Sequence, residues 1–254
     1  MLINKKLKSK VKNRKILITP YILVAAVFAS VFFLSSCSML DSMGVGKTVS
    51  EERQVSGIES ISIGSSMNLI IDQSGNESLG IEASENILPY ISSEVVNGEL
   101  QIELNRPGII IGPINCYVSV KDLKSIRVSS SAKVKCEKLQ AENLAVTMAS
   151  SSSGNLNVFV SNLDLEIASS ASLTISGEAD MQDTTVNSSG SLDASELVTR
   201  DCKIKVQSSG EATINVTDNL DATVNSSAEL NYKGNPKVNS DVSSSGEIKK
   251  IVIN

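Results

Sequence analysis

The side chains that could do chemistry in this chain of 254 residues are limited first by the complete absence of His. Imidazole is the commonest general base and a frequent metal ligand, so Ser-His-Asp hydrolases, HExxH metalloproteases and His-bound zinc sites are excluded. The chain also has no Trp and only 3% aromatic residues, which argues against an immunoglobulin-like sandwich and against stacking platforms for nucleic-acid bases. Serine hydroxyls and carboxylates are the groups that remain.

Pairs of serines that could supply nucleophilic hydroxyls recur along the second half of the chain. A Ser-Ser pair stands before Ala132, Gly154, Ala171, Gly190, Gly210, Ala228 and Gly246, at intervals of 17 to 22 residues. A serine nucleophile needs an adjacent base, and no His is present to serve as one. We therefore interpret the repeat as structural, in preference to nucleophilic catalysis or O-glycosylation, and predict no catalytic residue.

Three carboxylates recur with the same period. Glu211, Glu229 and Glu247 each follow the Gly or Ala of a serine pair, and clustered carboxylates suit a cation or a polysaccharide lyase. A lyase also needs a basic proton acceptor, and Lys249 and Lys250 lie near one end only. Two like charges about 5 Å apart in water repel by only about 0.8 kcal/mol, so solvated glutamates need no metal. We expect no metal and no cofactor; these glutamates are the one candidate cation site.

The residues around each serine pair alternate with a period of two. Two positions after the Gly or Ala all seven residues are apolar, as at Leu173 and Leu192, and the position between is polar. Four positions before it, six of seven are aliphatic, as at Val206 and Val224. Such alternation on both sides of a small-residue bend indicates half-buried strands. Units of about 18 to 20 residues suit one coil of three short strands better than a helical hairpin or a propeller blade.

The predicted fold is therefore all-β, a parallel β-helix whose coils stack about 4.8 Å apart and pair their backbones with both neighbours. Val206 should lie directly below Val224, whereas two facing antiparallel sheets would contradict the prediction. Alternation places the first serine of each pair inside with the aliphatic residues and the second in solvent. The predicted inner ladder consists of Ser130, Ser152, Ser169, Ser188, Ser208, Ser226 and Ser244.

The N-terminal segment is typical of a targeting signal. Residues 1–15 contain seven Lys or Arg and no acid, and residues 16–34 are almost entirely apolar. The sequence Leu34-Ser35-Ser36-Cys37 resembles the bacterial lipoprotein box, so residues 1–36 would be removed and Cys37 diacylated, which gives stable anchoring. The alternative is an uncleaved transmembrane anchor. We expect a tether over 37–50 and a β-helix over 51–254, less regular over 51–115 and regular over 116–254.

Removal of residues 1–36 would leave 16 basic and 28 acidic residues, a formal net charge of −12. Nucleic acid and anionic lipid surfaces are then unfavoured partners, apart from the membrane that holds the diacylglyceryl anchor. The remaining cysteines, Cys116, Cys136 and Cys202, match no metal or redox spacing. We expect buried thiols in preference to a disulfide.

Several segments resemble one bacterial family. They are Asn68–Gln73, Leu79–Ile91, Asn97–Leu100, Val118–Val120, Leu123–Ile126 and Ser129–Ala132. Together they resemble the domain called putative auto-transporter adhesin, head GIN domain, over roughly residues 53–250. The resemblance implies a right-handed β-helix and a setting among lipoproteins of Bacteroidetes. The family has no accepted catalytic residues, so none is carried over to this chain.

Three functions follow from this interpretation. The first is a non-enzymatic adhesion or binding module of the cell envelope, anchored in the outer membrane, whose polar outer columns bind a glycan or a protein. The second is a structural envelope protein that self-associates through its coil ends, since residues 247–254 carry apolar residues almost to the last position and no obvious polar cap. Lys249 and Lys250 could equally prevent such association by placing charge at the strand edge. The least favoured is a polysaccharide lyase-like enzyme.

Overall fold

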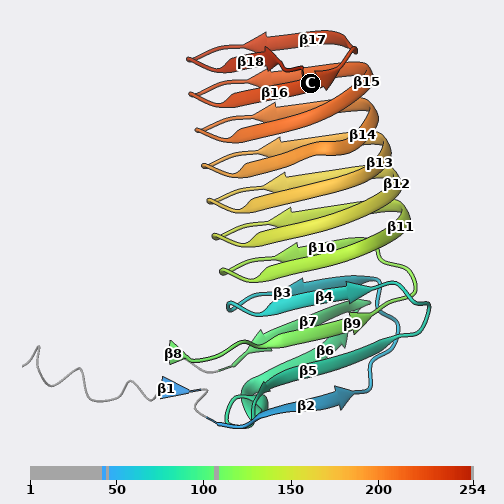
Figure 1. Ribbon diagram of the computed structural model, residues 1–254, viewed down its shortest axis with the longest axis vertical. Coiled ribbons are helices and arrows are strands. Elements are labelled where there is room, and N and C mark those ends of the chain that lie inside the picture. The colour runs from blue at the N-terminus through green and yellow to red at the C-terminus, as the bar shows by residue number, and fades with distance from the viewer. Residues whose placement is uncertain (1–41, 44–45, 106–108, 253–254) are drawn as a thin grey trace, which may run out of the picture. The chain divides into compact units, whose positions relative to one another are not determined.

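The computed structural model describes residues 42–43, 46–105 and 109–252. Residues 42–254 form one compact unit, an all-β solenoid of about seven coils stacked in parallel (Figure 1). The regular coils contain β10 (Ser125–Val128), β11 (Lys133–Met148), β12 (Ser153–Ile167), β13 (Ser172–Val186), β14 (Ser191–Val206), β15 (Glu211–Val224), β16 (Glu229–Gly234), β17 (Lys237–Val242) and β18 (Glu247–Lys250). Val206 pairs with Val224 in parallel register, so the predicted solenoid is confirmed.

Each coil has two legs instead of the three short strands we expected. Strands β11 to β15 are continuous for 14 to 16 residues, and each bends midway, so that a first leg and a second leg face each other (Figure 1). A tight serine turn joins each second leg to the next coil. Register shifts fall around the bend, as between Cys136 and Leu139 and between Ala194 and Val198. The bend therefore absorbs the differences in coil length.

Glycines are required at two of the bends. Gly177 and Gly234 have φ of 110° and 87°, and a Cβ on either would lie 1.9 Å from a backbone oxygen of the coil below. Only a residue without a side chain allows the coils to approach so closely at these points.

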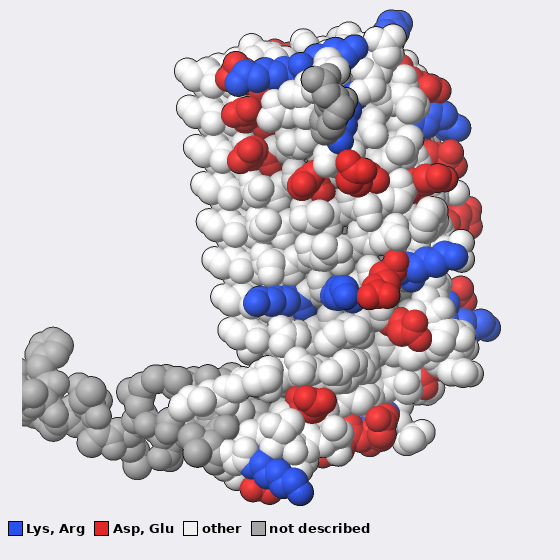
Figure 2. Space-filling view, viewed as in Figure 1, with Lys and Arg blue, Asp and Glu red and all other residues white. Residues whose placement is uncertain are grey.

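The outer faces of the legs are polar. Figure 2 shows the face formed by β4 (Asn68–Asp72) and the first legs stacked on it, with charged side chains over the lower and upper coils and a broad uncharged area across the middle. Ser153, Asn155, Ser172 and Thr174 belong to the middle coils of this face.

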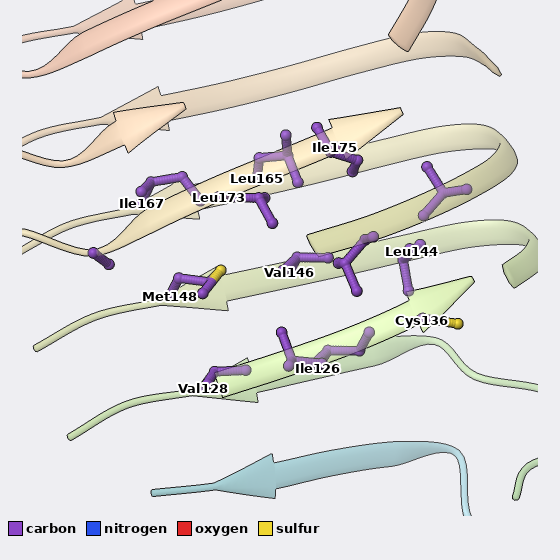
Figure 3. Close-up of a cluster of buried hydrophobic side chains, with 14 of the residues drawn as sticks. Ile126, Val128, Cys136, Leu144, Val146, Met148, Leu165, Ile167, Leu173 and Ile175 are labelled. Carbon is purple, nitrogen blue, oxygen red and sulfur yellow. The ribbon is translucent and has the colours of Figure 1, made fainter. Parts of the chain in front are cut away.

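The inner faces of the two legs pack against each other and form one continuous aliphatic core. Figure 3 shows part of it, with Val146 and Met148 on one coil below Leu165 and Ile167 on the next. These inner residues repeat along columns because the register is parallel. Leu, Ile and Val suit such columns, since branched side chains pack well on a pleated surface.

Both serines of each turn lie outside, so the predicted inner position of the first serine is wrong for six of the seven residues. Exposed instead of buried are Ser130, Ser169, Ser188, Ser208, Ser226 and Ser244. In each turn both serines have φ between 50° and 63°, and the turn closes with a bond such as Gly210 N–H to the carbonyl of Gln207 at 3.0 Å. Two positive φ values at the centre define a type I′ turn.

The remaining serine, Ser152, is buried for a different reason. The turn of its coil is Ser150-Ser151, so Ser152 occupies the inner position that Ala132 and Ala171 fill in neighbouring coils. Its hydroxyl donates to the carbonyl of Val128 at 3.1 Å. A ladder of serines does exist, but its bonds are backbone ones: Ser209 N–H donates to the Ser226 carbonyl at 3.0 Å, and six other turns repeat this contact.

The N-terminal end, over 51–115, is only partly coiled. β3 (Ser60–Ile63) and β4 form one coil, on which β10 and β11 stack, and β7 (Glu99–Leu104) and β9 (Asn115–Ser119) pair with them in parallel as a further, irregular coil. The remaining strands, β2 (Thr48–Arg53), β5 (Ser78–Ser84) and β6 (Ile91–Val96), pair antiparallel to their neighbours. A short parallel pair, β1 (Ser42–Met43) with β8 (Ile109–Ile110), lies beside them.

A 3₁₀ turn, η1 (Leu88–Tyr90), closes the base of the core, where Ile87 and Leu88 are buried. Arg53 fastens this cap: its guanidinium donates to the Ile91 carbonyl at 2.8 Å and to Ser93 Oγ at 3.0 Å. Among the described residues no helix has the length and apolar character needed to cross a membrane.

The serine turns predict a specific response to substitution. A left-handed conformation costs about 1–2 kcal/mol for ordinary residues and less for Asn. We expect Ser208→Val to lower the free energy of unfolding by about that amount, because a β-branched residue at positive φ is strained. Ser208→Asn should leave it nearly unchanged. Urea unfolding followed by far-UV circular dichroism measures both, and equal losses in the two variants would contradict the turn geometry.

Candidate functional site

A hollow in the described surface, here called the corner groove, lies on the second legs just after the bend. Its volume is about 710 Å³. It runs parallel to the solenoid axis across β11, β12, β13, β14, β15 and β17. Two outward rows form its walls: Asn143, Asn162, Met181, Asp201, Asn219 and Lys237 on one side, and Ala145, Asp164, Asp183, Lys203, Asp221 and Asn239 on the other.

The floor of the corner groove follows from strand geometry. Alternate residues of a strand point to opposite faces, so the row between the walls, which includes Leu144, Leu163 and Leu220, points into the core and is buried. The floor is therefore mostly backbone. Because every coil adds one residue to each wall, the groove presents a repeating set of polar groups at the coil spacing of about 4.8 Å.

Within each wall, amide side chains bond to a side chain of the neighbouring coil. Asn162 Nδ2 donates to Asn143 Oδ1 at 2.9 Å, Asn219 Nδ2 to Asp201 Oδ1 at 2.6 Å, and Asn239 Nδ2 to Asp221 Oδ1 at 3.3 Å. A primary amide has two N–H donors and a carbonyl acceptor. Each amide of the ladder is thus held in orientation by one bond and keeps further hydrogen-bonding atoms for a ligand.

The charge of the corner groove is mixed. Four aspartates, Asp164, Asp183, Asp201 and Asp221, face three lysines, Lys124, Lys203 and Lys237. The hydrogen bond from Asn219, followed by that from Arg200, lowers the pKa of Asp201 below its ordinary value. Its carboxylate is therefore ionised at neutral pH and accepts hydrogen bonds.

Met181 gives the corner groove an apolar point midway along its length, with 55% of its surface exposed. It follows Asn162 in register and precedes Asp201. Ligand sites commonly combine apolar contact with a few oriented polar groups. The surface thus offers both a contact for C–H faces and donors and acceptors for hydroxyl groups.

The structure brings the three glutamates of the candidate cation site into one column. Glu211 pairs with Glu229, and Glu229 with Glu247. Lys249 lies beside the column, with its Nζ 2.9 Å from Glu247 and 3.6 Å from Glu229. The hydrogen bond to Glu247 is the main reason that the pKa of Lys249 is raised. Among the described residues no group of three or more His, Cys, Asp or Glu could hold a metal ion.

The other predicted site residues lie elsewhere. Cys37 falls outside the described residues. Cys116, Cys136 and Cys202 are free and buried, which confirms the expectation of core thiols. The sequence analysis did not find the corner groove, although a signal was present. Asn143, Asn162 and Asn219 occupy the same position of their coils, and the last two are followed two residues later by Asp164 and Asp221.

The chain belongs to the family described as putative auto-transporter adhesin, head GIN domain, whose model matches residues 58–236. The resemblance seen in the sequence is therefore confirmed. No curated protein matches the chain.

Solved structures share the fold. One from Bacteroides fragilis, described as a putative adhesin, is 20% identical with a TM-score of 0.72, and the match covers 82% of this chain and 99% of that one. Another, from Parabacteroides distasonis, described as a putative lipid binding protein, is 23% identical with a TM-score of 0.69, covering 82% and 98%. A putative adhesin from Parabacteroides merdae is 20% identical with a TM-score of 0.65, covering 83% and 98%.

The buried thiols should be inert in the folded protein. Burial raises the pKa of Cys202 to about 12, so its thiolate is scarce at pH 8, and the thiolate is the reactive form. We expect negligible alkylation of Cys202 by iodoacetamide at pH 8 without denaturant and complete alkylation in 6 M guanidinium, measured by peptide mass spectrometry. Rapid labelling of the folded protein would contradict this packing.

Proposed function

We propose that this protein is a lipid-anchored, non-enzymatic adhesion module of the cell envelope that binds an extended glycan along the corner groove. The observation that carries the proposal is the amide and carboxylate ladder, in which three asparagine amides bond to the preceding coil and most coils add a polar group to each wall. A linear polysaccharide also repeats its hydroxyl groups along its length. A straight groove with repeating donors and acceptors suits such a ligand.

The polar character of the groove supports a glycan over nucleic acid. The Asp side chains of the walls would repel phosphate, and the mature chain would carry a net charge of −12 after removal of residues 1–36. Hydroxyl groups, in contrast, can donate to carboxylates and amide oxygens and accept from amide N–H and ammonium groups. The family name, which describes an adhesin, agrees with a binding role.

A binding role without catalysis is supported by the residues of the groove. A lyase needs a basic residue beside carboxylates, and the groove residue closest to this description is Lys203, which stands between Asp183 and Asp221 in its row. We propose that it binds ligand instead. Release of unsaturated products from acidic polysaccharides by the wild-type protein, lost in Lys203→Met, would overturn the non-enzymatic proposal.

The proposal that a glycan binds in the corner groove predicts which amide side chains contribute to its affinity. In a glycan array followed by calorimetry with the best ligand, Asn162→Ala/Asn219→Ala should weaken binding about tenfold, since two hydrogen bonds contribute about 0.5–1.5 kcal/mol each. The matched control, Asn155→Ala/Asn231→Ala, removes two amides from the first legs, outside the groove. An equal loss in the control, or none in the groove variant, would place binding elsewhere.

The anchor proposal has its own test. We place the lipid on Cys37 and the protein in the outer membrane. Cells grown with a fatty-acid analogue should incorporate label into the wild type and the Ser38→Ala variant but not into Cys37→Ser, because the thiol is the site of acylation. Mass spectrometry of the wild type should find Cys37 as the first residue. Persistence of residues 1–36 in an unlabelled protein would favour an uncleaved anchor.

A further inference from the structure

The C-terminal end of the solenoid is open. Within the described residues β17 pairs only with β15, and β18 only with β16. Each of these two strands therefore presents an outer edge of backbone N–H and C=O groups, the kind of edge to which another strand readily adds. All six residues of β17 are exposed.

The hydrophobic core also ends uncovered at this point. Val238 stacks on Leu220 and Val242 on Val224, so both valines occupy inner columns. They are nevertheless 39% and 41% exposed, compared with 1% and 0% for the residues below them. The end of the solenoid thus combines a free backbone edge with an apolar cross-section.

Three lysines of the last coils are engaged within the molecule. Lys249 bonds to Glu247 and Glu229, and Lys250 Nζ donates to Asn235 Oδ1 at 3.0 Å. Lys233 bonds toward lower coils, to the Ser195 carbonyl and Glu196 at 3.1 Å each. These ammonium groups are held by their own or lower coils.

The opposite end is closed. There η1 covers the core, Ile87, Leu88 and Ile91 are buried, and the guanidinium of Arg53 ties the cap together. Among the residues that the structure describes, the apolar core is thus uncovered at the C-terminal end and covered at the other. This asymmetry favours a two-fold pairing of like ends over a head-to-tail filament.

We propose that two copies of this chain pair through their C-terminal ends, with β17 antiparallel to β17 of the second copy and Ser240 on the two-fold axis. This register sets Val238 opposite Val242 of the second copy in both directions, so the inner columns continue across the junction. Asn239 lies opposite Asp241, an amide and a carboxylate of the type that already bond between coils. No like charges face each other in this strand pair.

The pairing deepens the proposed adhesion function. β2, the first long strand of the solenoid, lies at the closed end (Figure 1), and we propose that the tether from Cys37 joins the solenoid there. Two molecules joined at their open ends would then extend their tethers in opposite directions. Molecules on two apposed surfaces could thereby hold each other.

Cross-linking tests the geometry with the full chain in detergent micelles. Residues directly opposite in an antiparallel pair have Cα atoms about 4.5–5.5 Å apart, a distance that a disulfide spans. Ser240→Cys should therefore form a covalent dimer rapidly on mild oxidation. The matched control is Ser172→Cys, an exposed serine on the outer face of β13. Cross-linking of Ser240→Cys no faster than the control would overturn the proposal.

Association is measured independently by multi-angle light scattering of the same detergent-solubilised protein. Because the anchors of the pair lie at opposite ends, the scattering particle should contain two protein copies, each with its anchor in its own micelle. Ser240→Lys places two ammonium groups together on the axis and should raise the dissociation constant at least tenfold, while Ser172→Lys should not. Particles with a single protein copy at micromolar protein, or a series of larger oligomers, would contradict a two-fold end pair. Ser240 does not line the corner groove, so unchanged glycan binding by Ser240→Lys separates this proposal from the glycan proposal.

Discussion

The structure depends on one constraint: every coil must stack on its neighbours with the same strands in register, because its backbone groups have no partners within the coil. The serine turns satisfy this constraint at the tightest point. Their central residues adopt positive φ, and the N–H of the second serine reaches the carbonyl of the first serine one coil further on, as from Ser189 to Ser208 at 3.1 Å. The small polar side chain tolerates this conformation and is left in solvent.

The repeat was visible in the sequence because inner positions must be apolar in every coil. Val206 and Val224 illustrate this, as do Leu173 and Leu192, which pair in the structure. The orientation of the serines was not visible, since alternation holds only while the chain stays extended. Two consecutive residues at positive φ interrupt it and turn both side chains outward. In the run Ser150–Ser153 the sequence analysis took Ser152 and Ser153 as the pair. The positive φ values of Ser150 and Ser151 place the turn two residues earlier, and Ser152 therefore lies inside.

The corner groove and the N-terminal cap were harder to predict for a different reason. The outward-facing positions show little sequence pattern, since Asn, Asp and Ser suit any solvated face equally. The position of the corner groove also depends on where the chain bends. The cap consists of antiparallel strands with the same alternation as the coils, and β5, for instance, has inner residues Leu79 and Ile81 like any leg. Alternation gives the buried face of a strand but not the direction of its partner.

One inner column of the core contains a polar residue. Gln182 stands in the column of Leu163 and Cys202, fully inside, yet its amide is satisfied: Thr199 Oγ1 donates to Gln182 Oε1, and Gln182 Nε2 donates to Thr184 Oγ1, both at 2.9 Å. A buried polar group left without such a bond costs about 1–3 kcal/mol. The uncovered valines of β17 are the converse case, since they are apolar residues of inner columns that no described coil covers. The second copy that we propose would supply both backbone hydrogen bonds and apolar cover at this end.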